Sequence, residues 1–201
     1  MDEKASRYII LASTSPRRQE LIAALRIPFE IMPSDANEDT PAGWGPSMIV
    51  ENLALRKADA VYRKMSDSRS NAIIVGSDTI VVLESDILGK PVDDNDAVRM
   101  ISSLQGRTHK VFTGVACVDA LTGERIVRHR MTSVRMKPLN MDQVMSYVRS
   151  GEPNDKAGAY AIQGLGASII EGIEGDYFNV VGLPISLLSD MLSEMGMHVL
   201  S

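Results

Sequence analysis

Two adjacent arginines, Arg17 and Arg18, stand where a short apolar run gives way to a helix. The run at residues 8–12 is typical of a buried strand, and Ser15 followed by Pro16 is typical of a helix start. The helix dipole disfavours a cation in the first turn, yet a guanidinium there can bind an anion that docks on the free N–H groups. Taken alone, exposure of both arginines to solvent is the simpler interpretation.

A second candidate is Asp78, because the polar residues 76–79 interrupt an apolar strand pattern. A carboxylate there is either buried and paired, or exposed where the strand ends or bulges, and Gly76 favours the open form. An accessible Asp78 could act as a general base or as an oxygen ligand for Mg²⁺. A purely structural turn explains the same residues.

Lys90 and Gln163 are weaker candidates when each is considered separately. Lys90 lies between Gly89 and Pro91 in a turn, and an ammonium group commonly binds phosphate, although the spacing is not that of a P-loop. Gln163 precedes a glycine-rich stretch, and its amide could recognise the edge of a nucleotide base. A tight glycine-rich turn is the structural alternative.

The composition limits the classes of function. The chain has 201 residues, a net charge of −5 and one cysteine, Cys117, so we expect one domain, no nucleic-acid polymer as partner and no internal disulfide. No apolar stretch reaches the length of a membrane span, and the N-terminus, at residues 1–4, lacks the apolar region of a signal peptide, so we expect a cytoplasmic protein that does not enter the membrane. The three histidines are far apart, which argues against a zinc site.

Periodicity predicts the elements that must position these residues. Apolar residues with helical spacing follow Pro16, follow Pro46 or Ser47, and recur at residues 97–104, 141–148 and 184–195. Strand patterns occur at residues 73–75, 79–83, 111–118 and 126–134, and a hairpin is predicted from residues 168–173 and 177–181 around a turn at 174–176. This alternation predicts an α/β fold with a mixed central sheet and helices on both sides.

Considered together, the motifs resemble one family. Residues 11–18, 76–79, 89–91, 106–111, 155–164 and 175–184 match, in order, the motifs of the Maf (septum formation) family of nucleoside triphosphate pyrophosphatases. The resemblance implies two lobes around a deep cleft, as in inosine triphosphatase, and often a homodimer. It also implies hydrolysis between the α and β phosphates with a divalent cation, Mg²⁺ or Mn²⁺.

The resemblance also implies roles for particular residues. Asp78 would be the base and a metal ligand, and Glu38, in the acidic loop at residues 34–45, would be a second metal ligand. Lys57 matches a further polar site position. The residues implied to hold the phosphates are Ser13, Arg17, Arg18 and Lys90.

Substrate preference follows from three positions. Arg17, Thr79 and Gln163 match the branch that acts on dTTP and UTP rather than the branch that acts on N7-methyl-GTP. Ser77, where alanine is usual, and the loop around Trp44 depart from the family pattern. The alternatives are the same chemistry on modified pyrimidine nucleotides or on N7-methyl-GTP, and a non-catalytic nucleotide-binding regulator of cell division.

Overall fold

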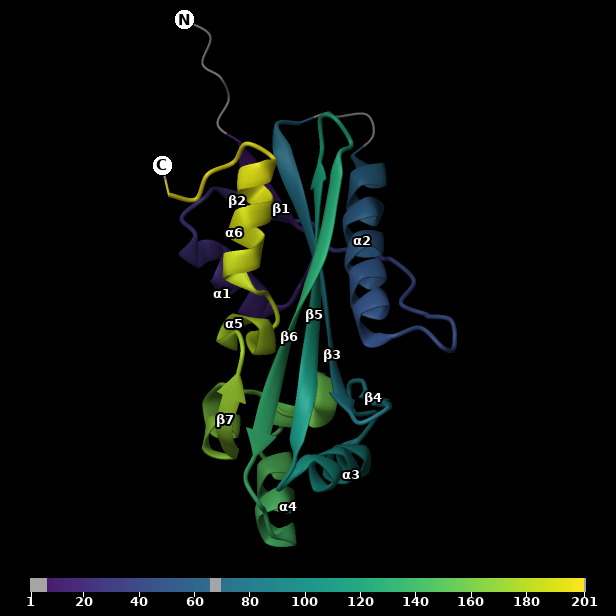
Figure 1. Cartoon of the computed structure of the whole chain (residues 1–201), viewed down its shortest axis with the longest axis vertical. Helices are drawn as coiled ribbons and strands as arrows, with labels where there is room; N and C mark the ends of the chain where they lie inside the picture. The colour runs from purple at the N-terminus through teal and green to yellow at the C-terminus, as the bar shows by residue number, and fades with distance from the viewer. Residues whose placement is uncertain (1–6, 66–69, 201) are drawn as a thin grey trace, which may run out of the picture. The chain divides into compact units, whose positions relative to one another are not determined.

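The computed structural model describes residues 7–65 and 70–200, which form two compact units (Figure 1). Unit 1 contains the described residues up to 78, residues 113–130 and residues 182–200, and unit 2 contains residues 79–112 and 131–181. The single domain expected over residues 1–201 stays a prediction. Residues 1–4, on which the expectation of no signal peptide depends, lie outside the described residues.

The elements follow one another as an alternation of strands and helices. The first part contains β1 (Tyr8–Leu11), α1 (Pro16–Ala24), β2 (Phe29–Ile31), α2 (Pro46–Lys64), β3 (Ala72–Leu83), β4 (Asp86–Leu88) and α3 (Asp94–Leu104). The second part contains β5 (Thr108–Asp119), β6 (Arg125–Met136), α4 (Met141–Arg149), three 3-10 turns η1 (Glu152–Asp155), η2 (Ala157–Ala159) and η3 (Gly164–Ser168), β7 (Ile170–Glu174), α5 (Tyr177–Val181) and α6 (Ile185–Glu194).

Within the described residues, seven strands form one sheet in the order β2-β1-β3-β5-β6-β7, with β4 paired to β3. Strand β1 runs parallel to both β2 and β3, with Ile10 opposite Glu30 and Ile74. The pairs β3–β4 and β6–β7 are antiparallel. The sheet is therefore mixed, as the sequence predicted, and the parallel pairs lie in unit 1.

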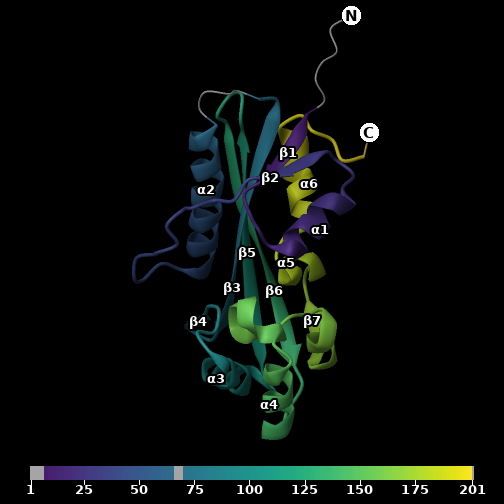
Figure 2. The same cartoon turned by 180° about the vertical axis from the view of Figure 1, so that it is seen from behind.

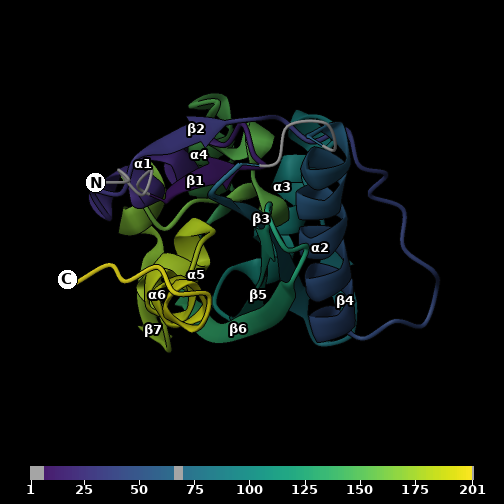
Figure 3. The ribbon, with the colours of Figure 1, turned by 90° about the horizontal axis from the view of Figure 1, so that it is seen from above.

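Unit 1 is built from helices on both faces of its strands (Figures 2 and 3). Alternate side chains of a strand point to opposite faces, and the two cores follow this parity. Ile9, Ile73 and Val115 pack with α1 and α6, whereas Ile10 and Ile74 pack with α2. Strands buried on both faces need nearly continuous apolar sequence, which explains the apolar runs in β1 and β3.

Unit 2 has a core of its own. Its strands contribute residues such as Val81, Val111 and Met136, which pack against the apolar stripes of α3 and α4. The capping residues explain where these helices begin: Asp93 accepts a hydrogen bond from Asp96 N, and Asn140 forms a capping box with Gln143. The methionines of these stripes differ in burial, because Met100 is buried whereas Met141 and Met145 are exposed.

The hairpin predicted around residues 174–176 is wrong in its second half. Residues Tyr177–Val181 form the short helix α5 instead of a strand. The Asp176 carboxylate accepts hydrogen bonds from the backbone N–H groups of Phe178, at 2.8 Å, and Asn179, at 3.3 Å, which is how an aspartate caps a helix start. The Asn179 side chain is buried and donates to the Val111 carbonyl and to Thr132, so packing in unit 2 overrides the strand preference of the two valines.

Cys117 is fully buried, and burial raises the pKa of its thiol to about 12, so it behaves as a small apolar core residue. Within residues 7–65 and 70–200, no helix is long and apolar enough to cross a membrane.

Candidate active site

Strand β3 carries Asp78 in a buried position. The sequence favoured an open strand end here, but β3 continues from Ala72 to Leu83, and both Ser77 and Asp78 are buried. The open form is therefore wrong, and the paired alternative is confirmed. The partner is Lys57 of α2, whose Nζ lies 2.6 Å from Asp78 Oδ1. The charge of the ammonium group compensates for the burial of the carboxylate.

Gly76 explains how helix and strand come so close. A methyl group at this position would lie 2.2 Å from the Ala54 carbonyl oxygen and 2.9 Å from the Ala58 nitrogen, both in α2. Only glycine lets the backbone of β3 approach the backbone of α2 at this distance. The glycine thus serves close packing, and this packing brings Lys57 to Asp78.

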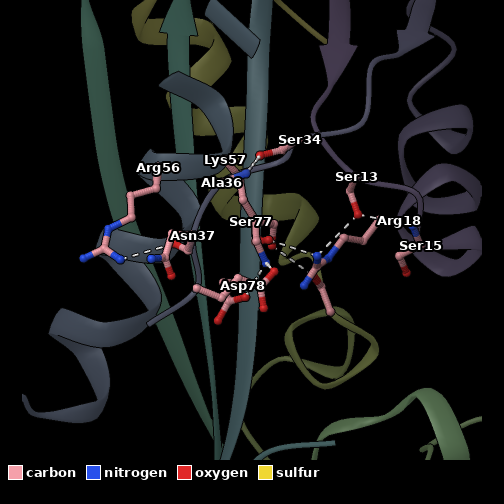
Figure 4. Close-up of polar contacts among 12 residues, drawn as sticks. Ser13, Ser15, Arg18, Ser34, Ala36, Asn37, Arg56, Lys57, Ser77 and Asp78 are labelled. Carbon is pink, nitrogen blue, oxygen red and sulfur yellow. Dashed lines mark hydrogen bonds and ion pairs between the residues drawn. The ribbon is translucent and has the colours of Figure 1, made fainter. Parts of the chain in front are cut away.

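Lys57 also contacts the acidic loop. Its Nζ lies 2.9 Å from Glu38 Oε1, so one ammonium group bridges a carboxylate that is 11% exposed and one that is 63% exposed. Arg56, the neighbour of Lys57, donates to the carbonyl oxygens of Asn37 and Asp39, at 3.3 and 2.6 Å (Figure 4). The loop on both sides of Glu38 is therefore held against α2.

Arg18 connects three segments of unit 1. It donates from Nε to the Gly182 carbonyl at 2.8 Å, and from Nη1 to the Ser77 carbonyl at 2.9 Å and to Ser13 Oγ at 3.4 Å (Figure 4). Burial lowers the pKa of its guanidinium from the ordinary value, and the nearby charges of Asp78 and Glu38 partly offset that effect. Arginine remains charged under such a shift, so Arg18 places a fixed positive charge near Asp78.

Ser13 and Ser15 organise the turn between β1 and α1. Ser15 is the residue before the helix and Pro16 its first residue, as predicted, but the Ser15 side chain makes no capping hydrogen bond. Instead, Ser15 N donates to Ser13 Oγ at 3.2 Å. Arg17 is half-buried beside Arg18, close enough for its charge to lower the pKa of Arg18. That both arginines bind an anion stays a prediction.

Three further predicted residues belong to unit 2. Thr79 follows Asp78 in β3 and is half-buried, Lys90 is exposed after β4, and Gln163 is half-buried directly before η3. The turn at Lys90 is tied to the 3-10 segment, because Gly158 N donates to the Gly89 carbonyl at 3.0 Å. Unit 1 therefore brings Ser13, Arg18, Lys57, Glu38 and Asp78 together, and the other three are described only within unit 2.

The donor set suits a hydrated hard cation better than a fully enclosed one. No group of three or more His, Cys, Asp or Glu side chains surrounds a metal position in the described part of the chain. Asp78 and Glu38 nevertheless present carboxylate oxygens to one shared position, which Lys57 Nζ now occupies. Mg²⁺ is commonly held by one or two carboxylates together with water and substrate phosphates, so these residues fit such an ion.

Sequence reasoning did not find three contributors to this site, Ser77, Gly182 and Arg56. Ser77 was noted only as a departure from the family pattern, yet its buried hydroxyl donates to the Gly182 carbonyl at 3.1 Å, the acceptor that Arg18 also uses. Gly182 lies 164 residues from Arg18, and no local signal connects them. Arg56 is the third omission, and its charge next to Lys57 was the available signal.

The chain is similar in sequence to several known proteins. A dTTP/UTP pyrophosphatase of Desulforamulus reducens is 50% identical over 96% of this chain and 99% of its own length, and one of Moorella thermoacetica is 49% identical over 95% and 96%. A crystallised nucleoside-triphosphatase / dITP/XTP pyrophosphatase of Mycobacterium abscessus is 16% identical, with a TM-score of 0.42 over 94% of this chain and 95% of that chain. The model of the Maf-like protein family matches residues 8–195, so the chain belongs to the Maf-like protein family.

Proposed function

We propose that this chain hydrolyses nucleoside triphosphates, foremost dTTP and UTP, to the monophosphate and pyrophosphate. The observation that carries the proposal is the grouping of Asp78, Lys57, Glu38 and Arg18 in unit 1. This grouping occurs in a chain that aligns almost end to end with relatives named dTTP/UTP pyrophosphatase, at 50% and 49% identity.

The reaction requires stabilisation of negative charge. Water attacks the α-phosphorus, the bond from the α-phosphorus to the bridging oxygen breaks, and pyrophosphate leaves with that oxygen. Arg17, Arg18, Lys57 and Lys90 supply the positive charge that binds the triphosphate and stabilises the charge developing on the leaving group. Ser13 Oγ already accepts from Ser15 N and Arg18, so its own hydroxyl proton can be donated to a phosphate oxygen.

Asp78 is the proposed general base. Its buried place in β3 limits the orientations of the carboxylate, which would take a proton from the attacking water. Asp78 and Glu38 would hold Mg²⁺ or Mn²⁺, which would supply a Lewis acid for the phosphate oxygens. Lys57, which now bridges these carboxylates, would then pair with the substrate phosphates.

Base selection is assigned to Arg17, Thr79 and Gln163, on the resemblance stated above. Thymine and uracil present a carbonyl oxygen where cytosine presents an amino group, and an amide side chain has both a donor and an acceptor with which to distinguish them. We expect the enzyme to act in the cytoplasm and to form a homodimer. Light scattering of the purified protein would measure the oligomeric state.

The deciding experiment incubates the purified protein with Mg²⁺ and a panel of dTTP, UTP, 5-methyl-UTP, N7-methyl-GTP and the other common nucleotides, and measures pyrophosphate and orthophosphate separately. Pyrophosphate release from dTTP and UTP is the expected result. Release from N7-methyl-GTP alone would move the chain to the other branch. Binding of nucleotides without any release would favour the regulator.

Asp78→Asn tests the role of the base. We expect turnover to fall by about 10²–10⁴-fold while the triphosphate still binds, because the amide cannot accept the proton. Asp59→Asn is the matched control, since Asp59 lies on α2 and pairs with Arg125 away from Asp78. Wild-type turnover in Asp78→Asn would remove this residue from the mechanism.

A further inference from the structure

The segment between α4 and β7 carries Gln163 but has little regular structure of its own. Residues 152–168 form three 3-10 turns, so many of their backbone N–H groups need partners other than helix or sheet hydrogen bonds. Two side chains supply such partners: Tyr147, in the last turns of α4, and Glu152, the first residue of the segment. Both lie in unit 2 with Gln163.

Glu152 holds the chain after Gln163. Its carboxylate accepts a hydrogen bond from Leu165 N at 2.9 Å on Oε2 and one from Gly166 N at 2.8 Å on Oε1. Burial alone would raise the pKa of Glu152, but the hydrogen bonds from Tyr147, Gly166 and Leu165 and the charge of Lys156 together lower it below its ordinary value. The carboxylate is therefore charged at neutral pH, and hydrogen bonds to a charged acceptor are the stronger kind.

Tyr147 holds the chain before Gln163. Its hydroxyl accepts a hydrogen bond from Ala161 N at 3.1 Å and donates one to Glu152 Oε1 at 2.8 Å. Tyr147 is buried, so these bonds are shielded from water. The backbone is thus fastened at residue 161 and again at residues 165 and 166, with Gln163 between the two points.

Two glycines on the C-terminal side of Gln163, Gly164 and Gly166, leave room for these contacts because they have no side chain. Gly164 has φ +64°, and a methyl group there would lie 2.5 Å from Glu152 Oε2. A methyl group at Gly166 would lie 2.0 Å from the Ala161 carbonyl oxygen and 2.8 Å from the Tyr147 hydroxyl. The Gln163 amide makes no hydrogen bond to protein across residues 7–65 and 70–200, so the fastened backbone presents a side chain that a ligand can use.

We propose that Glu152 and Tyr147 are positioning residues for base selection, which hold the backbone around Gln163 so that its amide meets the base in one orientation. The inference rests on the proposed function, because it assigns a role to residues behind the base-contacting side chain. Neither residue contacts the phosphates in this scheme. Their loss therefore acts on which base is accepted, and acts little on the chemistry at the α-phosphorus.

The test uses Glu152→Gln and Tyr147→Phe in the full chain. Glu152→Gln keeps the size of the side chain but replaces one acceptor oxygen with an amide NH2 group, which can only donate. Tyr147→Phe removes only the hydroxyl. We expect the ratio of kcat/KM for dTTP over dCTP to fall by about tenfold or more in each, through a higher KM for dTTP, since a lost hydrogen bond to a charged group changes binding by about 10–100-fold. Glu171→Gln, which removes only the exposed ion pair with Arg135, is the control and should keep the wild-type ratio.

A second measurement does not depend on activity. Amide hydrogen exchange at Leu165 and Gly166 should accelerate by about tenfold or more in Glu152→Gln, and exchange at Ala161 should accelerate in Tyr147→Phe. If exchange accelerates but the ratio is unchanged, or if exchange is unchanged, the proposal is overturned. Should Glu152→Gln not fold, Tyr147→Phe decides by the same two measurements.

The failure of the proposed function is a separate result. If the wild type releases no pyrophosphate from any nucleotide, the proposed reaction is wrong, and the dissociation constants for dTTP and dCTP replace kcat/KM in the same comparison. A wild type that binds dTTP no more tightly than dCTP would overturn the inference as well.

Discussion

Replacing Gly76 by alanine tests whether close packing of α2 on β3 positions Lys57 beside Asp78. The new methyl group would lie 2.2 Å from the Ala54 carbonyl oxygen, about 1.2 Å short of the 3.4 Å at which ordinary contact begins. Because the opposing atom belongs to helix backbone, the helix itself must move. We expect a loss of about 3 kcal/mol in the free energy of unfolding, the upper part of the usual range for an overpacked core.

The displacement of α2 should also lower the rate of the proposed reaction. Lys57 lies between the two α2 residues that the methyl group would contact, and its Nζ sits 2.6 Å from Asp78 Oδ1. A shift of about 1 Å at a reacting group can cost about 10²-fold in rate, so we expect turnover to fall by that order even where the variant is fully folded. Urea unfolding followed by circular dichroism measures the stability, and pyrophosphate release at low temperature measures the rate.

Two other glycines serve as comparisons. Gly172→Ala is the control for the substitution itself, because its methyl group would meet nothing nearer than Arg135 Nη2 at 3.6 Å. Gly114→Ala would place a methyl group 2.1 Å from the Val50 carbonyl oxygen of α2, about two turns from Lys57. It should lose similar stability with a smaller loss of turnover. If Gly76→Ala keeps the wild-type unfolding midpoint and turnover, the packing argument is refuted.

Three further predictions concern single side chains. Ser77→Ala should keep wild-type turnover and lower the free energy of unfolding in urea by about 1 kcal/mol, because it removes one buried hydrogen bond to the Gly182 carbonyl. A large loss of turnover would contradict this purely structural role of Ser77. Lys90→Ala should raise KM for the triphosphate by about 10–100-fold, the effect of losing one charged hydrogen bond. Lys110→Ala, which changes another exposed lysine of unit 2, should keep the wild-type KM. A wild-type KM in Lys90→Ala would exclude Lys90 from phosphate binding. Burial lowers the pKa of His109 from 6.5 to about 4, so as the pH falls the unfolded chain binds the proton before the folded chain does. The free energy of unfolding should therefore fall by about 3 kcal/mol as the pH is lowered from 6.5 to 4. In urea unfolding, His109→Leu should show a weaker dependence of this free energy on pH, and the same dependence as the wild type would refute the assignment.

Local patterns were sufficient to predict much of the fold. Helix starts were predicted at Pro16 and at Pro46 or Ser47, and the helices begin at Pro16 and Pro46, because a proline ring sets the dihedral angle that a first helical residue needs. The apolar runs in β1 and β3 predicted strands, and the alternation of helices and strands predicted helices on both sides of the sheet. In the structure, alternate side chains of these strands pack against helices on opposite sides. The same reasoning went wrong at Tyr177–Val181, where the capping of α5 by Asp176 and the burial of Asn179 outweigh the strand preference of valine.

The candidate site residues could be identified from the sequence, but the residues that they contact could not. Asp78, Lys57 and Glu38 could be named from motifs, whereas the bridge that Lys57 makes between the carboxylates depends on the approach of α2 to Gly76. Arg18 could be named as a helix-start cation, yet its acceptor at Gly182 lies 164 residues away. Backbone preferences and periodicity depend on residues close together in the sequence, so they can be predicted from the sequence alone. Contacts between distant segments form only when the core packs, and tertiary structure alone decides them.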